Sequence, residues 1–246
     1  MSRGNDRHVI VRTSRGPSQE VVTALAKSGV ATAHEAYGRR GLLGPELRPI
    51  YPGARIAGRA VTVLSHPGDN LMIHAAIEQC RAGDVLVVAT TSRSTDGMFG
   101  ELFATQLRHR GVLGLVTDAG VRDVADLTAM GFPVWSRAVH AQGTAKAVPG
   151  SVNVPVVAAG QLVNAGDIIV ADDDGVLCVP LDQGEAVVEA SARREANEEA
   201  KRRRFLQGEV GLDIYDMRPL LERLGVRYLD ADDATDPDTA PAEESP

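Results

Sequence analysis

Aromatic side chains are scarce in this chain and form only 4% of its residues. Proteins that hold single-stranded nucleic acid stack bases on aromatic rings, so this scarcity argues against such a platform. Thiols are equally rare, because Cys80 and Cys178 are the only cysteines and lack a metal-ligand spacing. Zinc ribbons and CxxC redox motifs are therefore excluded. What is present is a hydrophobic content of 43% over 246 residues, which suffices for a substantial core.

An excess of positive charge is also missing. The formal net charge is -7, and residues 230–246 hold seven acidic residues without Lys or Arg, so the rest of the chain sums to zero. Phosphate backbones and anionic membranes are bound by clustered Lys and Arg, so neither is an expected partner. No apolar run reaches the length of a membrane span, and residues 1–6 lack the apolar core of a secretion signal. We expect a cytoplasmic protein.

Apolar runs bounded by turn residues alternate with amphipathic stretches, which is typical of an α/β fold. The Asp174-Gly175 pair between two apolar runs predicts a hairpin. The patterns predict strands at residues 54–64, 85–89, 112–116, 132–136, 145–158 and 168–171, and helices at 20–27, 71–80, 183–206 and 214–224.

The predicted organisation has three parts. Residues 1–17 form a flexible lead-in, and residues 18–229 form a single α/β domain that includes C-terminal helices over 183–224. Residues 230–246 form an acidic tail, which we expect to be disordered because it has too little apolar surface to bury.

The candidate site rests on Glu101 and on the pair Arg122-Asp123, which follows after a gap of 20 residues. Each lies at a predicted strand-to-helix turn, and such turns meet at the edge where open α/β sheets bind ligands. A carboxylate holds a hard divalent cation, and an arginine grips an anionic substrate in a bidentate way. A small oxo acid would suit this set. The alternative is that Asp123 only caps a helix and Arg122 is its ion-pair partner.

Five segments of the chain carry a resemblance to a known family. The sequence resembles the 4-carboxy-4-hydroxy-2-oxoadipate / 4-hydroxy-4-methyl-2-oxoglutarate aldolases, class II pyruvate aldolases that share their fold with the regulator of ribonuclease E activity A. The resemblance covers about residues 18–229 and implies a β/β/α swivelling-type domain with a C-terminal helical extension. It also implies a homo-oligomer, either a trimer or a hexamer. The segments are residues 67–74, 96–105, 118–123, 150–155 and 213–218.

The resemblance also implies roles for single residues. Asp123 would ligate a divalent metal cation, Mg²⁺ or Mn²⁺, and Arg122 would contact the pyruvyl group of the substrate. Glu101 occupies a position that is commonly Asp in the family and would contact the waters of the metal. Glu198 would reach those waters from a neighbouring subunit, with Glu199 as the second choice. Backbone amides of Gly100, Glu101, Leu102 and Phe103 would bind the substrate carboxylate.

The implied reaction is a retro-aldol cleavage of a small 2-oxo acid substrate to pyruvate and a second oxo acid, in the catabolism of aromatic acids such as protocatechuate and gallate. Oxaloacetate decarboxylation passes through the same enolate and is expected as a secondary activity. The base that takes the C4 hydroxyl proton stays open at this point, and the candidate is a metal-bound hydroxide, or a water relayed by Glu101 or Glu198.

Two rival interpretations remain. A Schiff-base aldolase needs a lysine of lowered pKa, and of the three lysines only Lys146 is a plausible candidate. A non-catalytic regulator that binds a ribonuclease could use the same fold. Of the histidines, His74 is singled out because it follows the Gly68-Asp69-Asn70 turn and could face the pocket.

Overall fold

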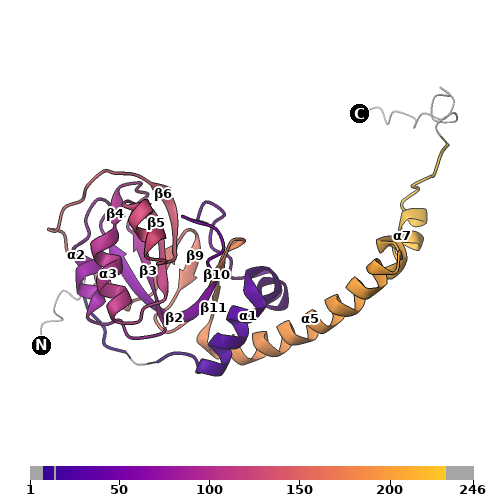
Figure 1. The fold of residues 1–246 in the computed structure, drawn as a ribbon, viewed down its shortest axis with the longest axis horizontal. Helices are drawn as coiled ribbons and strands as arrows, with labels where there is room; N and C mark the ends of the chain where they lie inside the picture. Colours follow the sequence, from indigo (N-terminus) through magenta and orange to yellow (C-terminus); the bar gives the residue numbers. More distant parts are fainter. Residues whose placement is uncertain (1–7, 14, 231–246) are drawn as a thin grey trace, which may run out of the picture. The chain divides into compact units, whose positions relative to one another are not determined.

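The computed structural model describes residues 8–13 and 15–230 (Figure 1). The chain divides into two compact units between Glu195 and Ala196. The predicted acidic tail, except for Asp230, and eight of the 17 residues of the predicted lead-in lie outside the described residues, so the three-part organisation stays a prediction.

A mixed sheet forms the centre of the first unit. Its four middle strands run parallel in the order β6-β5-β3-β2, and antiparallel strands flank them on both sides. The parallel strands are β2 (Ile56–Ser65), β3 (Asp84–Thr90), β5 (Gly114–Val121) and β6 (Val134–Val139), with the short β4 (Gly97–Phe99) also parallel to β5. The antiparallel strands are β1 (Arg48–Pro49), β7 (Ser151–Val152), β10 (Ile168–Asp172) and β11 (Gly175–Val179).

Both faces of the sheet are covered, as the continuous apolar runs of its strands predict. Along β3, Val85, Val87 and Ala89 belong to one buried cluster, while Leu86 and Val88 belong to the cluster on the opposite face. This split follows from the two-residue side-chain period of a strand. The predicted hairpin at Asp174-Gly175 is confirmed, since β10 and β11 pair antiparallel across it.

Helices cover one face of the sheet, and strands pack on the other. The helical layer consists of α2 (Leu71–Ile77), α3 (Glu101–His109) and α4 (Val124–Ala129), which share a buried cluster with β2, β3 and β5 (Figure 1). On the other face, the pair β8 (Val156–Ala158) and β9 (Gln161–Val163) packs against β2 and β3 through β8. The predicted α/β class with β/β/α layers is thereby confirmed.

The first helix, α1 (Gln19–Ala36), packs on β10 and β11 and changes direction at Gly29, whose φ of 77° lies outside helical geometry. The helix predicted over 20–27 is confirmed, and a further helical segment follows the break at Gly29. Two other predictions are confirmed only in part. The segment 145–158 is mostly loop and contributes only β7 and β8, and the single helix predicted over 214–224 is two short helices.

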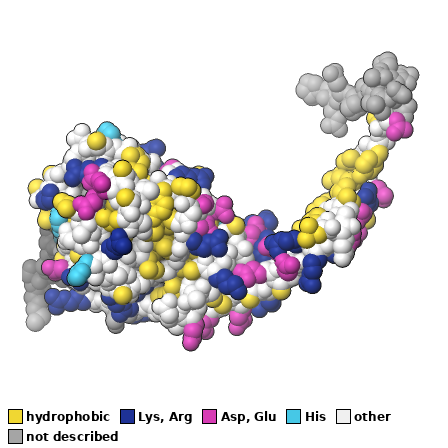
Figure 2. Space-filling view, in the orientation of Figure 1, with side chains coloured by type: hydrophobic (Ala, Val, Ile, Leu, Met, Phe, Trp, Pro, Cys, Tyr) yellow, Lys and Arg dark blue, Asp and Glu magenta, His cyan; other side chains and the backbone are white. Residues whose placement is uncertain are grey.

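The C-terminal helices are α5 (Gly184–Leu206), α6 (Gly211–Ile214) and α7 (Arg218–Arg223). The break between α6 and α7 occurs because Asp216 adopts a left-handed φ of 51°, which ends one helix before the next begins. Apolar side chains lie on the surface of the second unit, including Leu206, Leu224 and Tyr228 (Figure 2). Over the part of the chain that the structure describes, every helix is too short or too polar to cross a bilayer.

Candidate active site

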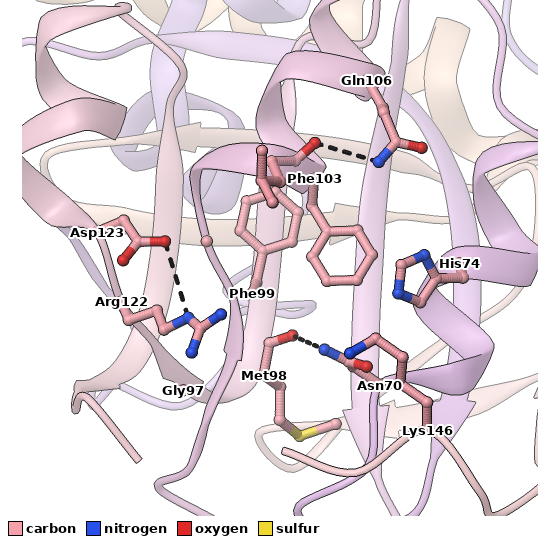
Figure 3. Close-up of a pocket in the computed structure, with 12 residues that line it drawn as sticks. Asn70, His74, Gly97, Met98, Phe99, Phe103, Gln106, Arg122, Asp123 and Lys146 are labelled. Atoms are coloured by element: carbon pink, nitrogen blue, oxygen red, sulfur yellow. Dashed lines mark hydrogen bonds and ion pairs between the residues drawn. The ribbon is translucent and has the colours of Figure 1, made fainter. Parts of the chain in front are cut away.

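A small cavity of about 160 Å³ opens where β4 and β5 end and α3 and α4 begin. It is smaller than the roughly 300–1,000 Å³ pockets that take drug-sized ligands, so it suits a compact substrate. Two sides of it are distinct in Figure 3: Arg122 and Asp123 lie on one side of Phe103, and Asn70, His74 and Lys146 lie on the other. The predicted arrangement of Arg122 and Asp123 at this sheet edge therefore matches the observed cavity.

Asp123 occupies the N-cap position of α4, but its carboxylate does not cap that helix. Instead, Oδ2 accepts a hydrogen bond of 3.1 Å from the backbone N–H of Glu101, at the start of α3. The residue has a left-handed φ of 59°, which is uncommon outside glycine and turns the side chain toward α3. The alternative that Asp123 serves only as a helix cap is thus not supported by its hydrogen bonds.

Gly100 leaves the space that the Asp123 carboxylate occupies. A Cβ atom at residue 100 would lie 2.2 Å from Oδ2 of Asp123, far inside normal contact. Gly97 is equally constrained, since its Cβ would lie 2.3 Å from the carbonyl oxygen of His140. The floor of the cavity is therefore main chain, and the carboxylate lies directly against it.

Arg122 provides a cation beside this carboxylate. Its Nε lies 3.7 Å from Oδ2 of Asp123, and its backbone N–H donates to the carbonyl oxygen of Phe99, which ties the turn to β4. The first turn of α3 adds further positive potential, because helix N-termini carry unpaired N–H groups. Gly100, Leu102 and Phe103, which the sequence predicts as substrate contacts, all line the cavity.

Lys146 comes from the loop between β6 and β7 and is carried to the cavity by a backbone clamp. The N–H of Asn70 donates to the carbonyl oxygen of Ala145, and the buried carboxylate of Asp69 accepts from the N–H groups of Ala147 and Val148. The two segments also form an isolated bridge. Lys146 is thereby held over the start of α2.

His74 lies on α2 and packs against Phe103, with ring centroids 4.4 Å apart. Burial, and then the positive charge of Lys146, lower the pKa of His74 below its usual value. Asn70 is the N-cap residue of α2, and His74 lies four residues further along the same helix. The sequence drew attention to His74, whereas Asn70 and the clamp that carries Lys146 left no signal of their own.

The other two predicted site residues, Glu101 and Glu198, do not line the cavity. The Glu101 carboxylate accepts a hydrogen bond of 2.6 Å from Thr105 Oγ1 on its own helix, and the backbone N–H of Glu101 donates to Asp123 Oδ2. Glu198 lies in the second unit, where it lines a surface depression with Lys201, Phe205 and Tyr215. Their roles at the metal stay predictions.

A divalent metal at this site would have few protein ligands. Within residues 8–13 and 15–230, no three His, Cys, Asp or Glu side chains cluster as a ligand set. The Asp123 carboxylate is engaged only through Oδ2, and Oδ1 makes no hydrogen bond to the residues that the structure describes. A cation bound mainly by water and substrate oxygens fits such a site, and Mg²⁺ is typically held through one or two carboxylates.

Comparison with known proteins gives a consistent result. The RraA-like family, described as Aldolase/RraA, matches residues 24–178. A protein of Halalkalibacterium halodurans is 29% identical over 69% of this chain and 80% of its own length. A protein of Burkholderia multivorans is 36% identical over 62% of this chain and 94% of its own length. Both carry the name "Putative 4-hydroxy-4-methyl-2-oxoglutarate aldolase".

Among solved structures, RraAS2 of Streptomyces coelicolor superposes with a TM-score of 0.69 at 29% identity, over 77% of this chain and 99% of that one. It is described as an unusual member of the RNase ES inhibitor RraA protein family. The comparisons therefore include both an aldolase name and an inhibitor name for the same fold.

Proposed function

This chain belongs to the RraA-like family, described as Aldolase/RraA, and from that premise we propose that it is a divalent-metal-dependent pyruvate aldolase. Its substrate would be 4-carboxy-4-hydroxy-2-oxoadipate, 4-hydroxy-4-methyl-2-oxoglutarate, or both. The products would be pyruvate and a second oxo acid. The names of the two curated relatives support the aldolase class.

The observation that carries this proposal is the pairing of Asp123 with Arg122 over a main-chain floor. Asp123 would hold the cation, Mg²⁺ or Mn²⁺, with water and substrate oxygens as its other ligands. When bound, such a cation acts as a Lewis acid that polarises the 2-oxo group. The remaining work falls to the side chains and amides of the chain itself.

Arg122 would stabilise the negative charge that develops on the pyruvyl oxygen as the C3–C4 bond breaks. The N-terminal amides of α3, around Leu102, would bind the substrate carboxylate. Together with Lys146, Arg122 gives the cavity two cations against the single carboxylate of Asp123, a balance that favours an anionic substrate.

Oxaloacetate decarboxylation would follow from the same arrangement, because loss of CO₂ leaves the same pyruvate enolate. We place the enzyme in the cytoplasm, in aromatic-acid catabolism. We further propose a homotrimer or homohexamer in which Glu198 of one subunit approaches the site of a neighbour. The exposed apolar side chains of the second unit support an oligomer, since large apolar patches are typical of interfaces.

A regulator that binds a ribonuclease is the second candidate. It is favoured by the similarity to the Streptomyces coelicolor protein, whose chain is covered almost completely. The two functions differ in their chemistry. A regulator needs no polarised carbonyl, so substitution of Asp123 would leave its ribonuclease binding unchanged. In an aldolase the same substitution would abolish pyruvate release.

The test is pyruvate release from both branched oxo acids by the purified protein, with Mg²⁺, with Mn²⁺ and with a chelator. We expect turnover that the chelator abolishes and either metal restores. Arg122→Ala and Asp123→Ala should each lower kcat by about a hundredfold or more, as the loss of a preorganised stabilising group does. Circular dichroism checks that both variants fold.

The Schiff-base alternative has a physical candidate, because Lys146 lines the cavity. Borohydride reduction in the presence of pyruvate would trap a covalent adduct on Lys146 if it acts that way. Chelator-resistant turnover with such an adduct would refute the metal-dependent mechanism. Absence of turnover with every metal, together with capture of a ribonuclease, would favour the regulator.

A further inference from the structure

The α2 side of the cavity carries an exposed imidazole, His74, that makes no hydrogen bond to the residues that the structure describes. Neither ring nitrogen of His74 is bonded to another group in the described part of the chain, although the ring is fixed against Phe103. Partial burial of the ring, and then the positive charge of Lys146, lower the pKa of His74, which favours the neutral ring. His74 therefore presents a lone pair that can accept a proton.

Asn70 adds a second acceptor on the same side of the cavity. It is the N-cap residue of α2, a position where an Asn side-chain oxygen usually accepts from the first turn, yet this one makes no cap bond. Its Nδ2 donates instead to the carbonyl oxygen of Met98 at 3.3 Å, which fixes the amide orientation. Oδ1 is left buried and without a partner.

An acceptor that is buried and unpaired is unfavourable unless a ligand or water supplies a donor. The dianion of a 4-hydroxy-2-oxo acid such as 4-hydroxy-4-methyl-2-oxoglutarate has one donor, its C4 hydroxyl, because its carboxylates and keto group only accept. Figure 3 shows Asn70 and His74 on the other side of Phe103 from Arg122 and Asp123. A substrate whose 2-oxo acid end is bound by Arg122 and Asp123 would therefore direct its C4 hydroxyl toward these two acceptors.

We propose that His74 is the general base that removes the C4 hydroxyl proton in the retro-aldol reaction. This inference rests on the proposed function. The sequence suggested a metal-bound hydroxide, or a water relayed by Glu101 or Glu198, but the Glu101 carboxylate is bonded to Thr105 and is absent from the cavity lining. His74 is the neutral proton acceptor that the chain itself places in the cavity.

The step balances without a further reactant. The O–H bond of the C4 hydroxyl breaks and its proton passes to a ring nitrogen of His74, which becomes imidazolium. The O–H electron pair forms the new C4=O bond, the C3–C4 bond breaks, and its electrons form the pyruvate enolate. Protonation of the enolate at C3, by the imidazolium or by water, gives pyruvate and returns His74 to its neutral form.

Oxaloacetate decarboxylation offers an internal control, because oxaloacetate has no C4 hydroxyl and its cleavage requires no base. His74→Phe keeps the packing against Phe103 and should lower kcat/KM for 4-hydroxy-4-methyl-2-oxoglutarate by about 10²-fold or more, the usual contribution of a positioned general base. The same variant should retain decarboxylation within about threefold of wild type. His109→Phe, the same change at an exposed position of α3, should alter neither reaction.

The pH dependence gives an independent readout. A neutral His74 is required, so kcat/KM for the hydroxylated substrate should fall as the pH drops through the pKa of His74, below about 6.5. Arg122, Asp123 and Lys146 are the other charged groups lining the cavity. Decarboxylation should lack this acidic limb, and His74→Phe should lose it for residual aldol cleavage. Added imidazole should rescue His74→Ala for aldol cleavage alone.

The outcomes separate the two levels of the proposal. If wild type cleaves no 4-hydroxy-2-oxo acid, the proposed function fails and this inference with it. If wild type is active but His74→Phe, verified as folded by circular dichroism, loses both reactions equally, His74 is structural and the inference is overturned. Full aldol activity in that variant would place the base elsewhere. Should His74→Phe not fold, the ratio of the two activities in His74→Gln decides in the same way.

Discussion

A single methyl group at Gly100 should disable the site while leaving the fold intact. The residue has φ -155° and ψ -167°, an extended conformation that alanine adopts without strain. Its new Cβ would lie 2.2 Å from Oδ2 of Asp123, whereas ordinary van der Waals contact begins at 3.4 Å. The carboxylate would have to move by about 1 Å and would lose its hydrogen bond from the Glu101 N–H.

A displacement of this size in a catalytic group costs about a hundredfold in rate, or about 2.7 kcal/mol in the barrier. We therefore expect Gly100→Ala to lower kcat/KM for pyruvate release about a hundredfold and to raise the Mg²⁺ concentration needed for half-maximal activity. Pyruvate release can be followed with lactate dehydrogenase and NADH. Gly211→Ala is the matched control, because its Cβ would meet Phe205 at 3.8 Å, an ordinary contact.

Near-wild-type activity in a folded Gly100→Ala variant would refute the reasoning. It would mean that the position of the Asp123 carboxylate is not what the reaction depends on. A loss of activity that accompanies a large loss of thermal stability would also contradict it, because the clash would then disturb the fold and not only the site.

Two further predictions concern stability. Arg59→Ala should lower the free energy of unfolding in urea by about 3–5 kcal/mol, because it leaves the buried Asp84 without the guanidinium that lies 2.6 Å from its Oδ2; a change below about 1 kcal/mol would be inconsistent with a buried ion pair. The pKa of Asp69 is lowered, since burial acts to raise it but hydrogen bonds from the N–H groups of Leu71, Ala147 and Val148 outweigh burial. The stability that Asp69 contributes is present above its unfolded pKa of about 3.9 and is lost as the pH falls through the folded pKa. The difference in unfolding free energy between wild type and Asp69→Asn should therefore shrink below about pH 4. A difference that stays constant down to about pH 2 would contradict this.

Much of the fold was predictable because local patterns agreed with the tertiary structure. The apolar run of β3 is buried on both faces, and the turn at Asp174-Gly175 joins an antiparallel pair. The position of Arg122-Asp123 was predictable for the same reason, since a strand that ends before a helix begins can place a turn only at the sheet edge.

The α2 side of the cavity was harder to predict because it depends on long-range backbone contacts. Lys146 lies in an irregular loop, and only the clamp between Asp69 and the residues after Ala145 brings it to the cavity. The sequence offers no periodicity for such a segment, so the strands predicted over 145–158 are found only at β7 and β8. Similarly, the left-handed Asp216 breaks a helix whose apolar spacing looks continuous.

The glycines of the cavity floor also determine how this site could be altered. A side chain at position 97 or 100 would collide with backbone or with the Asp123 carboxylate at 2.2–2.3 Å, so the floor cannot be reshaped one substitution at a time. The opposite wall is built from replaceable side chains. Directed evolution toward bulkier or differently branched acids should therefore diversify the loop around residue 146 and the positions of α2 other than His74, and should leave the glycine positions untouched.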